Sequence, residues 1–238
     1  MNVRPAPFPV SRADSLLAPL LTAAPDRPYV IAQLGQSLDG RIATPTGASR
    51  WINRGAALDH LHRLRASVDA VVVGVSTVIE DDPLLTVRRV TGPHPARVVI
   101  DPNGRVAANA RCLADDGVRR VVVRAREELR DARVETMVIP AEDGWIDPNR
   151  MAAQLFASGL RKILIEGGAT TISRFIDAGA VDRLHVLVAP VILGSGKPGL
   201  NLKPIDAVNE ARRPRTRVHI LDDGDVLFDC EMRHREEG

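Results

Sequence analysis

The sequence predicts an α/β protein with a mainly parallel central sheet, helices on both faces of the sheet, and an antiparallel hairpin at its C-terminal edge. Two observations predict this fold class. Short, nearly continuous apolar runs alternate with helical patterns along most of the chain, as is typical of parallel strands buried on both faces. The C-terminal segment instead reads as two strands joined by an Asp-Gly turn, which is typical of a β-hairpin.

Each predicted strand of the parallel part is a short run rich in valine, isoleucine and leucine. These runs cover residues 29–35, 70–74, 97–101, 120–123, 136–139, 162–166 and 184–193. The hairpin strands are predicted over residues 216–221 and 226–232, with the turn between them.

Helices are predicted over residues 54–68, 148–158 and 169–178. In the first, apolar residues recur every three to four positions and form one stripe. The other two are each followed by a glycine, Gly159 or Gly179, the usual residue beyond a helix C-terminus. Residues 1–27 are rich in proline and alanine, and we expect an N-terminal extension there, with one short helix around residues 13–21. A single domain is expected over residues 28–238.

Composition argues against several classes of protein. The net charge of +2 is low for a nucleic-acid-binding protein, which usually carries a clustered basic stripe. Cys112 and Cys230 are far apart, and His60 and His62 point to different faces of a helix, so no metal site is predicted. No apolar run is long enough to cross a bilayer, and prolines interrupt the N-terminus where a signal peptide would stand. We therefore expect a cytoplasmic protein.

Two glycine-rich segments follow predicted strands. Residues 194–199, Gly-Ser-Gly-Lys-Pro-Gly, match the dinucleotide-binding pattern G-x-G-x-x-G, but Pro198 and Pro204 bracket the segment Gly199–Lys203, and no amphipathic helix follows. We reject a Rossmann or P-loop site because the motif works through a helix N-terminus. Residues 166–171, Glu-Gly-Gly-Ala-Thr-Thr, do open a predicted helix and can hold an anion there. A tight strand-to-helix turn capped by threonine, with no bound anion, is an alternative interpretation of equal weight.

A second strand end carries hydroxyl and acidic side chains. Residues 74–88 begin at the end of the run 70–74 and contain Ser76, Thr77, Asp81 and Arg88. These side chains suit contacts with a phosphate or a ribose. Taken by itself, the segment reads as a helix cap followed by a loop.

An ordered set of motifs resembles one known family. It consists of Ser37–Ala43, Gly47–Ile52, Leu64–Ala66, Asp69-Ala70, Gly74, Ser76–Val78, Asp81–Arg88, Arg97–Asp101, Glu166–Gly168 and Ala189-Pro190. In this order and spacing, residues 28–238 resemble the reductase domain of the bacterial bifunctional riboflavin-biosynthesis deaminase/reductase. The resemblance implies a dihydrofolate-reductase-like three-layer α/β/α fold, the cofactor NADPH and a homodimer.

The resemblance also implies which residues contact the ligands. The family's cofactor contacts fall on Gly35, Trp51, Thr77, Asp81, Gly168, Ala169, Thr170, Thr171, Ile172, Ser173 and Arg174. Its substrate contacts fall on Gln33, Ser49, Arg65, Leu85, Arg88 and Glu166. It assigns no proton donor and no metal.

The implied reaction reduces the ribosyl group of 5-amino-6-(5-phosphoribosylamino)uracil to the ribityl form in riboflavin biosynthesis. A hydride from the nicotinamide reaches C1′ of the substrate, a small phosphorylated pyrimidine. The guanidinium groups of Arg65 and Arg88 are suited to bind its 5′-phosphate through two parallel hydrogen bonds each. Arg65 also fits a solvated cation at a helix C-terminus, and Trp51 also fits core packing, so these alternatives stay open.

The sequence departs from the family in two ways. It carries no deaminase signature, so we expect a free-standing reductase, and its order relative to deamination stays open. Gln33 stands where the family usually has a lysine. Lysine only donates hydrogen bonds, whereas glutamine donates and accepts, which suits a differently substituted ring, such as a diamino-pyrimidinone, a pterin or a dihydrofolate-like substrate. A catalytically silent nucleotide-binding paralogue is a further alternative. A phosphosugar hydrolase is disfavoured, because no nucleophile-and-base pair is apparent.

Overall fold

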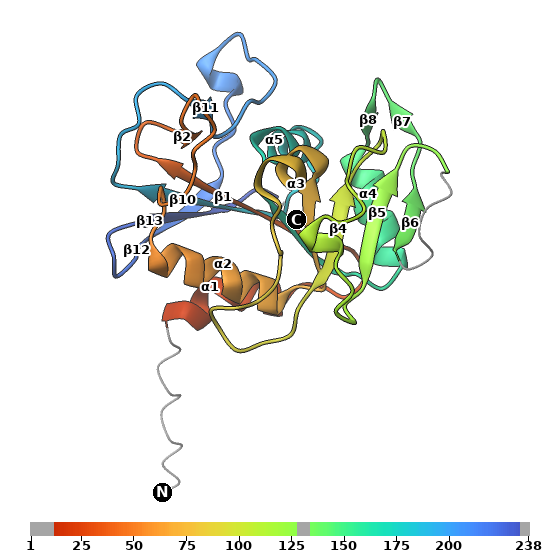
Figure 1. Ribbon diagram of the computed structural model, residues 1–238. Helices are drawn as coiled ribbons and strands as arrows, with labels where there is room; N and C mark the ends of the chain where they lie inside the picture. Colours follow the sequence, from red (N-terminus) through yellow and green to blue (C-terminus); the bar gives the residue numbers. More distant parts are fainter. Residues whose placement is uncertain (1–11, 128–133, 234–238) are drawn as a thin grey trace, which may run out of the picture.

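The computed structural model describes residues 12–127 and 134–233. Its main sheet has nine strands in the order β12-β13-β10-β1-β9-β3-β4-β5-β6 (Figure 1). The strands are β1 (Tyr29–Ser37), β3 (Ala70–Gly74), β4 (Ala96–Ile100), β5 (Arg120–Arg124), β6 (Glu135–Val138), β9 (Lys162–Glu166), β10 (Arg183–Ala189), β12 (Arg215–Ile220) and β13 (Val226–Glu231). Two small antiparallel ribbons pair β2 (Arg41–Ala43) with β11 (Lys197–Pro198), and β7 (Ala141–Glu142) with β8 (Trp145–Ile146).

The strand pairing confirms the predicted fold class. Every neighbouring pair from β10 to β6 is parallel, whereas β13 runs antiparallel to both β10 and β12. The C-terminal hairpin therefore forms one edge of the sheet, as the Asp-Gly turn predicts.

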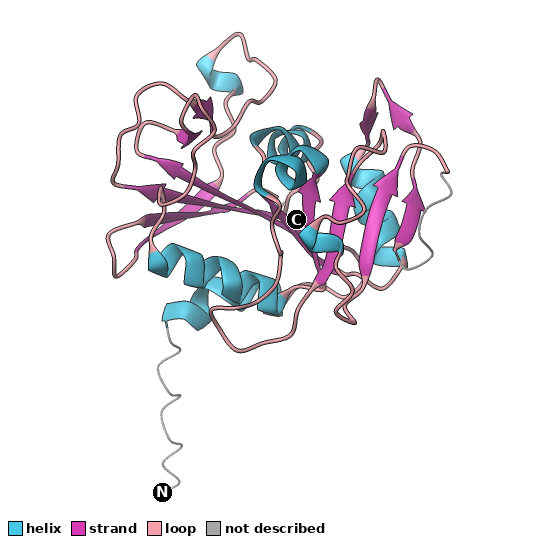
Figure 2. Ribbon diagram, viewed as in Figure 1, coloured by secondary structure: helices cyan, strands magenta, loops and turns pink. Residues whose placement is uncertain are grey.

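Helices cover both faces of the sheet (Figure 2). They are α1 (Arg12–Leu21), α2 (Gly55–Ser67), α3 (Val75–Asp81), α4 (Pro148–Ala157) and α5 (Ala169–Asp177). Successive strand residues enter opposite cores, because side chains alternate along a strand: Ile31 packs in the core beneath α1, α2 and α3, and Ala32 packs in the core beneath α4 and α5. This double burial explains the continuous apolar runs.

Two elements, α3 and the end of β10, differ from the sequence predictions, and a third, α1, agrees with them. Residues 75–81 form the helix α3, where a cap and loop are predicted from the segment alone. Strand β10 ends at Ala189 and not at residue 193, because Pro190 has no N–H for the ladder. The expected helix in the extension is α1, and its Leu16 and Leu20 are buried. This part of the extension thus packs on the body, and residues 1–11 lie outside the described chain.

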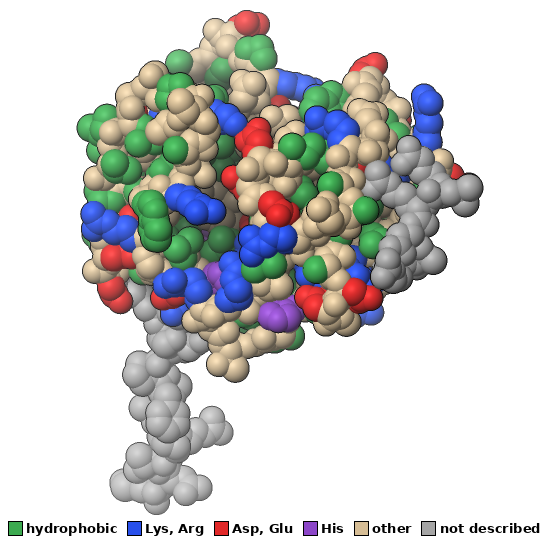
Figure 3. Space-filling view, in the orientation of Figure 1, with side chains coloured by type: hydrophobic (Ala, Val, Ile, Leu, Met, Phe, Trp, Pro, Cys, Tyr) green, Lys and Arg blue, Asp and Glu red, His purple; other side chains and the backbone are tan. Residues whose placement is uncertain are grey.

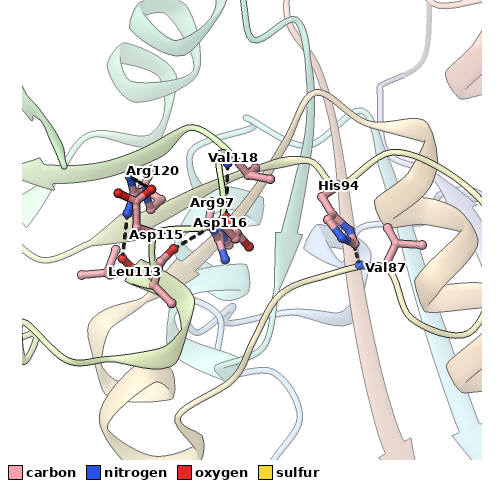
Figure 4. Close-up of polar contacts among 9 residues, drawn as sticks. Val87, His94, Arg97, Leu113, Asp115, Asp116, Val118 and Arg120 are labelled. Carbon is pink, nitrogen blue, oxygen red and sulfur yellow. Dashed lines mark hydrogen bonds and ion pairs between the residues drawn. The ribbon is translucent and has the colours of Figure 1, made fainter. Parts of the chain in front are cut away.

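Loops on the α2 side of the sheet are pinned by side chains from the strands. Arg97 of β4 pairs with Asp116, and Arg120 of β5 pairs with Asp115 at 2.8 Å (Figure 4). In the same view, the backbone N–H of Val87 donates to Nδ1 of His94 at 3.1 Å. The segment after α3 is therefore held in a defined path past the sheet.

A row of polar residues crosses the sheet beneath α2. Glu166 of β9, Gln33 of β1, His185 of β10 and Asp229 of β13 are neighbours in register. Nε2 of His185 lies 3.1 Å from a carboxylate oxygen of Asp229, and Nδ1 of His185 lies 2.9 Å from Nε2 of His60 in α2, so the three side chains form one hydrogen-bonded row. Burial lowers the pKa of His60 to about 3, so this histidine is neutral at pH 7. One end of the row is thus internally satisfied, and its other end, at Gln33 and Glu166, reaches the candidate site.

Candidate active site

Two adjoining cavities lie where β1, β3 and β9 end. The carboxylate cavity, of about 290 Å³, includes Gln33, Gly35, Leu85 and Glu166 in its lining. The helix cavity, of about 500 Å³, lies between the starts of α3 and α5 and extends to Trp145 and to Pro102, Asn103 and Arg105. Parallel strands present their carboxyl ends at one edge, which is where ligands bind in open α/β sheets.

The two cavities meet at a common rim. The residues that line both are Ile42, Thr77, Glu80, Gly168 and Lys197. Nζ of Lys197 lies 2.8 Å from Oε2 of Glu80, so this ion pair ties β11 to α3 across the rim. Two ligands, one in each cavity, would touch each other here.

The glycine turn after β9 forms part of this rim. Gly167 and Gly168 have φ values of 64° and 49°, a backbone conformation that favours glycine. A Cβ on Gly168 would lie 2.9 Å from Oγ1 of Thr77, and one on Gly74 would lie 2.5 Å from Oγ1 of Thr171. The starts of α3 and α5 therefore approach each other only because glycine stands at these positions. The first N–H groups of α5 have no intrahelical acceptor and face an anion there without a rearrangement.

A buried ion pair lies at the floor of the carboxylate cavity, with Glu166 in the lining and Arg65 behind it. Arg65 of α2 donates from Nε and Nη2 to the two carboxylate oxygens of Glu166 at 2.6 and 2.5 Å, and from Nη1 to the carbonyl of Thr86 at 2.9 Å. Both side chains are buried. Burial opposes the charged guanidinium, but the charge of Glu166 and the bonds to it outweigh that effect and raise the pKa of Arg65. All three nitrogens of the Arg65 guanidinium therefore already donate hydrogen bonds, to Glu166 and to Thr86.

Arg88 lies on the outer side of this ion pair. It is exposed, its Nη1 donates to the hydroxyl of Thr86 at 2.8 Å, and its backbone N–H donates to Nδ1 of His62 at 2.9 Å. Burial and the charges of Arg65 and Arg88 lower the pKa of His62 to about 4. A neutral His62 can accept that hydrogen bond, which fixes the backbone of Arg88.

Most of the predicted ligand contacts line the two cavities. Those in the carboxylate cavity are Gln33, Gly35, Ser49, Asp81, Leu85 and Glu166. Those in the helix cavity are Ala169, Thr170, Thr171 and Arg174, while Thr77 and Gly168 line both. Two cofactor contacts implied by the resemblance, Gly35 and Asp81, thus lie on the carboxylate side of the rim. Burial and the charge of Glu80 raise the pKa of Asp81.

Five predicted contacts line neither cavity. Ile172 packs in the core, and the hydroxyl of Ser173 accepts from the backbone N–H of Asn201 at 2.8 Å. The side chain of Trp51 is not in the core, the alternative considered above, because this residue is 87% exposed. Arg65 lies behind Glu166, and Arg88 lies beyond Thr86. The two arginines therefore adjoin the carboxylate cavity through these partners and are not part of its lining.

Several lining residues were not predicted from the sequence. They are Glu80, Asn103, Arg105, Trp145 and Lys197. Lys197 belongs to the glycine-rich segment 194–199, which forms β11 and opens no helix, as the rejection of a Rossmann site requires. The sequence does show a lysine among glycines after a strand. The position of this lysine opposite Glu80, however, depends on the tertiary fold. Trp145 and Arg105 carried no local signal.

Charged side chains of both signs are interspersed over the face shown in Figure 3. Among residues 12–127 and 134–233, no three histidine, cysteine or acidic side chains gather closely enough to hold a metal ion. Within the same ranges, every helix is too short or too polar to pass through a bilayer.

Comparison with known proteins identifies the family. Residues 28–219 match the family described as the RibD C-terminal domain. The chain belongs to this family. It is 35% identical over 190 residues to the 2,5-diamino-6-ribosylamino-4(3H)-pyrimidinone 5′-phosphate reductase of Methanothermobacter thermautotrophicus, covering 77% of this chain and 87% of the relative. It is 34% identical over 211 residues to the riboflavin biosynthesis protein RibD of Aquifex aeolicus, covering 85% of this chain but only 58% of that protein.

Solved structures agree with this assignment. A deaminase/5-amino-6-(5-phosphoribosylamino)uracil reductase from Thermotoga maritima superposes with a TM-score of 0.75 at 25% identity, covering 91% of this chain and 59% of that one. The Saccharomyces cerevisiae riboflavin biosynthesis reductase Rib7 superposes with a TM-score of 0.73 at 19% identity, covering 91% and 97%. The dihydrofolate-reductase-like fold that the resemblance implies is thereby confirmed.

Proposed function

We propose that this protein is an NADPH-dependent oxidoreductase of riboflavin biosynthesis that reduces the ribosyl group of 5-amino-6-(5-phosphoribosylamino)uracil to the ribityl form. The observation that carries this proposal is the common rim of the two cavities in a chain of the RibD C-terminal domain family. Hydride transfer requires the donor and acceptor carbons to lie about 3–3.5 Å apart. Two cavities that open onto one another at Thr77 and Gly168 allow that approach.

The helix cavity suits the cofactor. Its floor holds the first turn of α5 and the glycine turn before it, where the backbone offers free N–H groups to a pyrophosphate. A side chain at Gly168 would collide with Thr77 and fill this space. When bound there, NADPH supplies the hydride, and the protein supplies alignment and exclusion of water.

The carboxylate cavity suits the pyrimidine. No described residue hydrogen-bonds the amide of Gln33, which lines this cavity beside Glu166. Gln33 can therefore donate to or accept from the edge of a ring. Arg65 acts through Glu166, whose carboxylate it holds in one orientation, and Arg88 remains the group for the substrate phosphate at the outer side. Arg88→Ala should accordingly weaken substrate binding more than NADPH binding.

A second substrate is the diamino-pyrimidinone analogue. The Methanothermobacter relative named above is called a reductase of that compound, and this chain covers 87% of its length. Gln33 accommodates either ring substituent, because rotation of its amide exchanges a donor for an acceptor.

A turnover assay tests the proposal. The protein is mixed with NADPH carrying deuterium at C4 of the nicotinamide and with the uracil substrate, the diamino analogue or dihydrofolate. We expect NADPH absorbance to fall with the uracil substrate and one deuterium to appear at C1′ of the product. Faster turnover of the diamino analogue would place the enzyme before deamination. Binding of NADPH without turnover of any of the three would instead support a silent paralogue. Failure to bind NADPH would contradict both the proposed reductase and the silent paralogue.

We further propose a cytoplasmic homodimer. Val218 and Ile220 of β12 and Phe228 of β13 share one face of the C-terminal hairpin and are 56%, 64% and 36% exposed. The paired edge strands thus present an apolar surface of the kind that marks interfaces. Both cysteines of the chain are free and buried, which suits a reducing compartment.

Val218→Asp should convert the dimer to a monomer, because the new carboxylate would be desolvated at the interface. Light scattering after gel filtration measures the mass directly. Val208→Asp is the matched control, since Val208 is 76% exposed in a different segment, and this variant should remain dimeric. A monomeric wild-type protein would refute the dimer.

A further inference from the structure

We propose that His62 and His94 are positioning residues that hold Arg88 in place for the phosphate of the substrate. This inference rests on the proposed function, because it takes Arg88 as the group that meets that phosphate. Neither histidine belongs to the lining of the two cavities described above. Both act on Arg88 through the backbone of residues 85–88.

Two neighbouring backbone N–H groups of this segment each donate to a histidine. The N–H of Arg88 donates to Nδ1 of His62 at 2.9 Å, and the N–H of Val87 donates to Nδ1 of His94 at 3.1 Å (Figure 4). His62 belongs to α2, whereas His94 lies just before β4. The segment is therefore held from two separate parts of the fold.

These contacts fix the protonation state of both rings. Since the donors are backbone N–H groups, Nδ1 of each ring must be unprotonated, and each neutral ring carries its hydrogen on Nε2. Burial and the charges of Arg65, Arg88 and Arg89 lower the pKa of His62 to about 4, although the charge of Glu166 acts in the opposite direction. At pH 7 His62 is thus an acceptor, as the backbone of Arg88 requires.

The same segment begins with a strained residue. Leu85 is buried, lines the carboxylate cavity and has φ of 56°. This left-handed conformation is unfavourable for leucine and persists only where the surrounding contacts impose it. Hydrogen bonds at the next three residues supply that constraint, because the carbonyl of Thr86 also accepts from Nη1 of Arg65 at 2.9 Å. The two histidines thus provide two of three consecutive backbone contacts.

Arg88 carries a charge that an anion would stabilise. Although the residue is exposed, partial burial and the charges of Arg65 and Arg111 lower the pKa of Arg88. Among residues 12–127 and 134–233, no carboxylate forms an ion pair with it. A dianionic phosphate would relieve the repulsion between these cations. An arginine whose backbone is already fixed also loses less conformational freedom when it binds that phosphate.

Steady-state kinetics with the uracil substrate and with its dephosphorylated form test the inference. His94 is exposed, so its variants should fold. His94→Leu should raise KM for the phosphorylated substrate roughly 3- to 10-fold, the factor that corresponds to one hydrogen bond. KM for NADPH and for the dephosphorylated substrate should stay unchanged. His94→Asn is the matched control and should keep the wild-type values, because its amide oxygen takes the position of Nδ1.

A double-mutant cycle shows whether His94 acts through Arg88. Arg88→Ala should itself raise KM for the phosphorylated substrate, and adding His94→Leu should then raise it no further. His62→Leu and His62→Asn repeat the comparison for the second histidine, with thermal unfolding measured alongside, because His62 is buried.

The outcomes separate the two proposals. If the wild type reduces neither form of the substrate, the proposed function fails. If the wild type is active but His94→Leu keeps its KM, the function survives and the role of the histidines is overturned. An equal rise in KM for both forms of the substrate, or an undiminished effect of His94→Leu in the Arg88→Ala background, would overturn that role as well.

Discussion

Glu166→Ala is expected to lower the free energy of unfolding by about 3–5 kcal/mol, because it leaves the guanidinium of Arg65 buried without a counter-charge. Both side chains of the pair are 7% exposed, and both oxygens of Glu166 are used. Urea unfolding monitored by circular dichroism measures the change. Activity should disappear as well, since Glu166 lines the carboxylate cavity.

Two further variants show that this cost comes from an uncompensated buried charge. Asp59→Ala breaks another ion pair of α2, between Asp59 and Arg89, whose side chains are 34% and 42% exposed. It should cost less than about 1 kcal/mol. The double variant Arg65→Met/Glu166→Leu removes both charges and should recover most of the lost stability without recovering activity. A Glu166→Ala protein as stable as the wild type would contradict the burial of this pair.

Gly167→Ala is expected to reduce kcat/KM roughly 100-fold, the order expected for a displacement of about 1 Å at a reacting centre. Gly167 has φ of 64°, and a Cβ there would lie 2.9 Å from Cγ2 of Thr77. Thr77 must therefore move, and it borders both cavities. Steady-state kinetics with NADPH and the uracil substrate measure the effect.

Gly179→Ala is a matched control for this prediction. Gly179 has φ of 63°, so alanine carries the same backbone strain of about 1–2 kcal/mol, but its Cβ would meet nothing within 4 Å. It should lose stability and keep kcat/KM. Adding Thr77→Ser to Gly167→Ala removes the colliding methyl group and should restore part of the activity. Equal kinetics for the two alanine variants would show that the contact with Thr77 is unimportant.

Several predicted site residues lie at or just after a strand end, and the structure brings these residues together. Glu166 ends β9, Gly168 follows it in the glycine turn, and Thr77 lies just after β3, so parallel strand ends bring them to one edge. The prediction that Arg65 is free to hold a phosphate did not anticipate its bidentate pairing with Glu166, a residue 101 positions away. Periodicity showed that Arg65 ends an amphipathic helix but not what its guanidinium would meet.

The far end of the helix cavity is a similar case. Arg105 lies on a short loop with no periodicity, and its partner Ser76 is 29 positions away on α3. Trp145 belongs to a two-residue strand that no local pattern predicts. These residues enter the site because the loops after β4 and after β6 extend to the same end of the helix cavity.

The sequence by itself determined the fold class, the strands of the parallel sheet, the edge hairpin and the family, because apolar alternation, turn chemistry and motif order are local properties of the chain. Only the tertiary structure decided which charges compensate each other: Arg65 with Glu166, Lys197 with Glu80, and Arg105 with no carboxylate among the described residues. The physical reason is that the strength of a charge interaction depends on distance and burial, and both are set by how the helices and loops pack over the sheet.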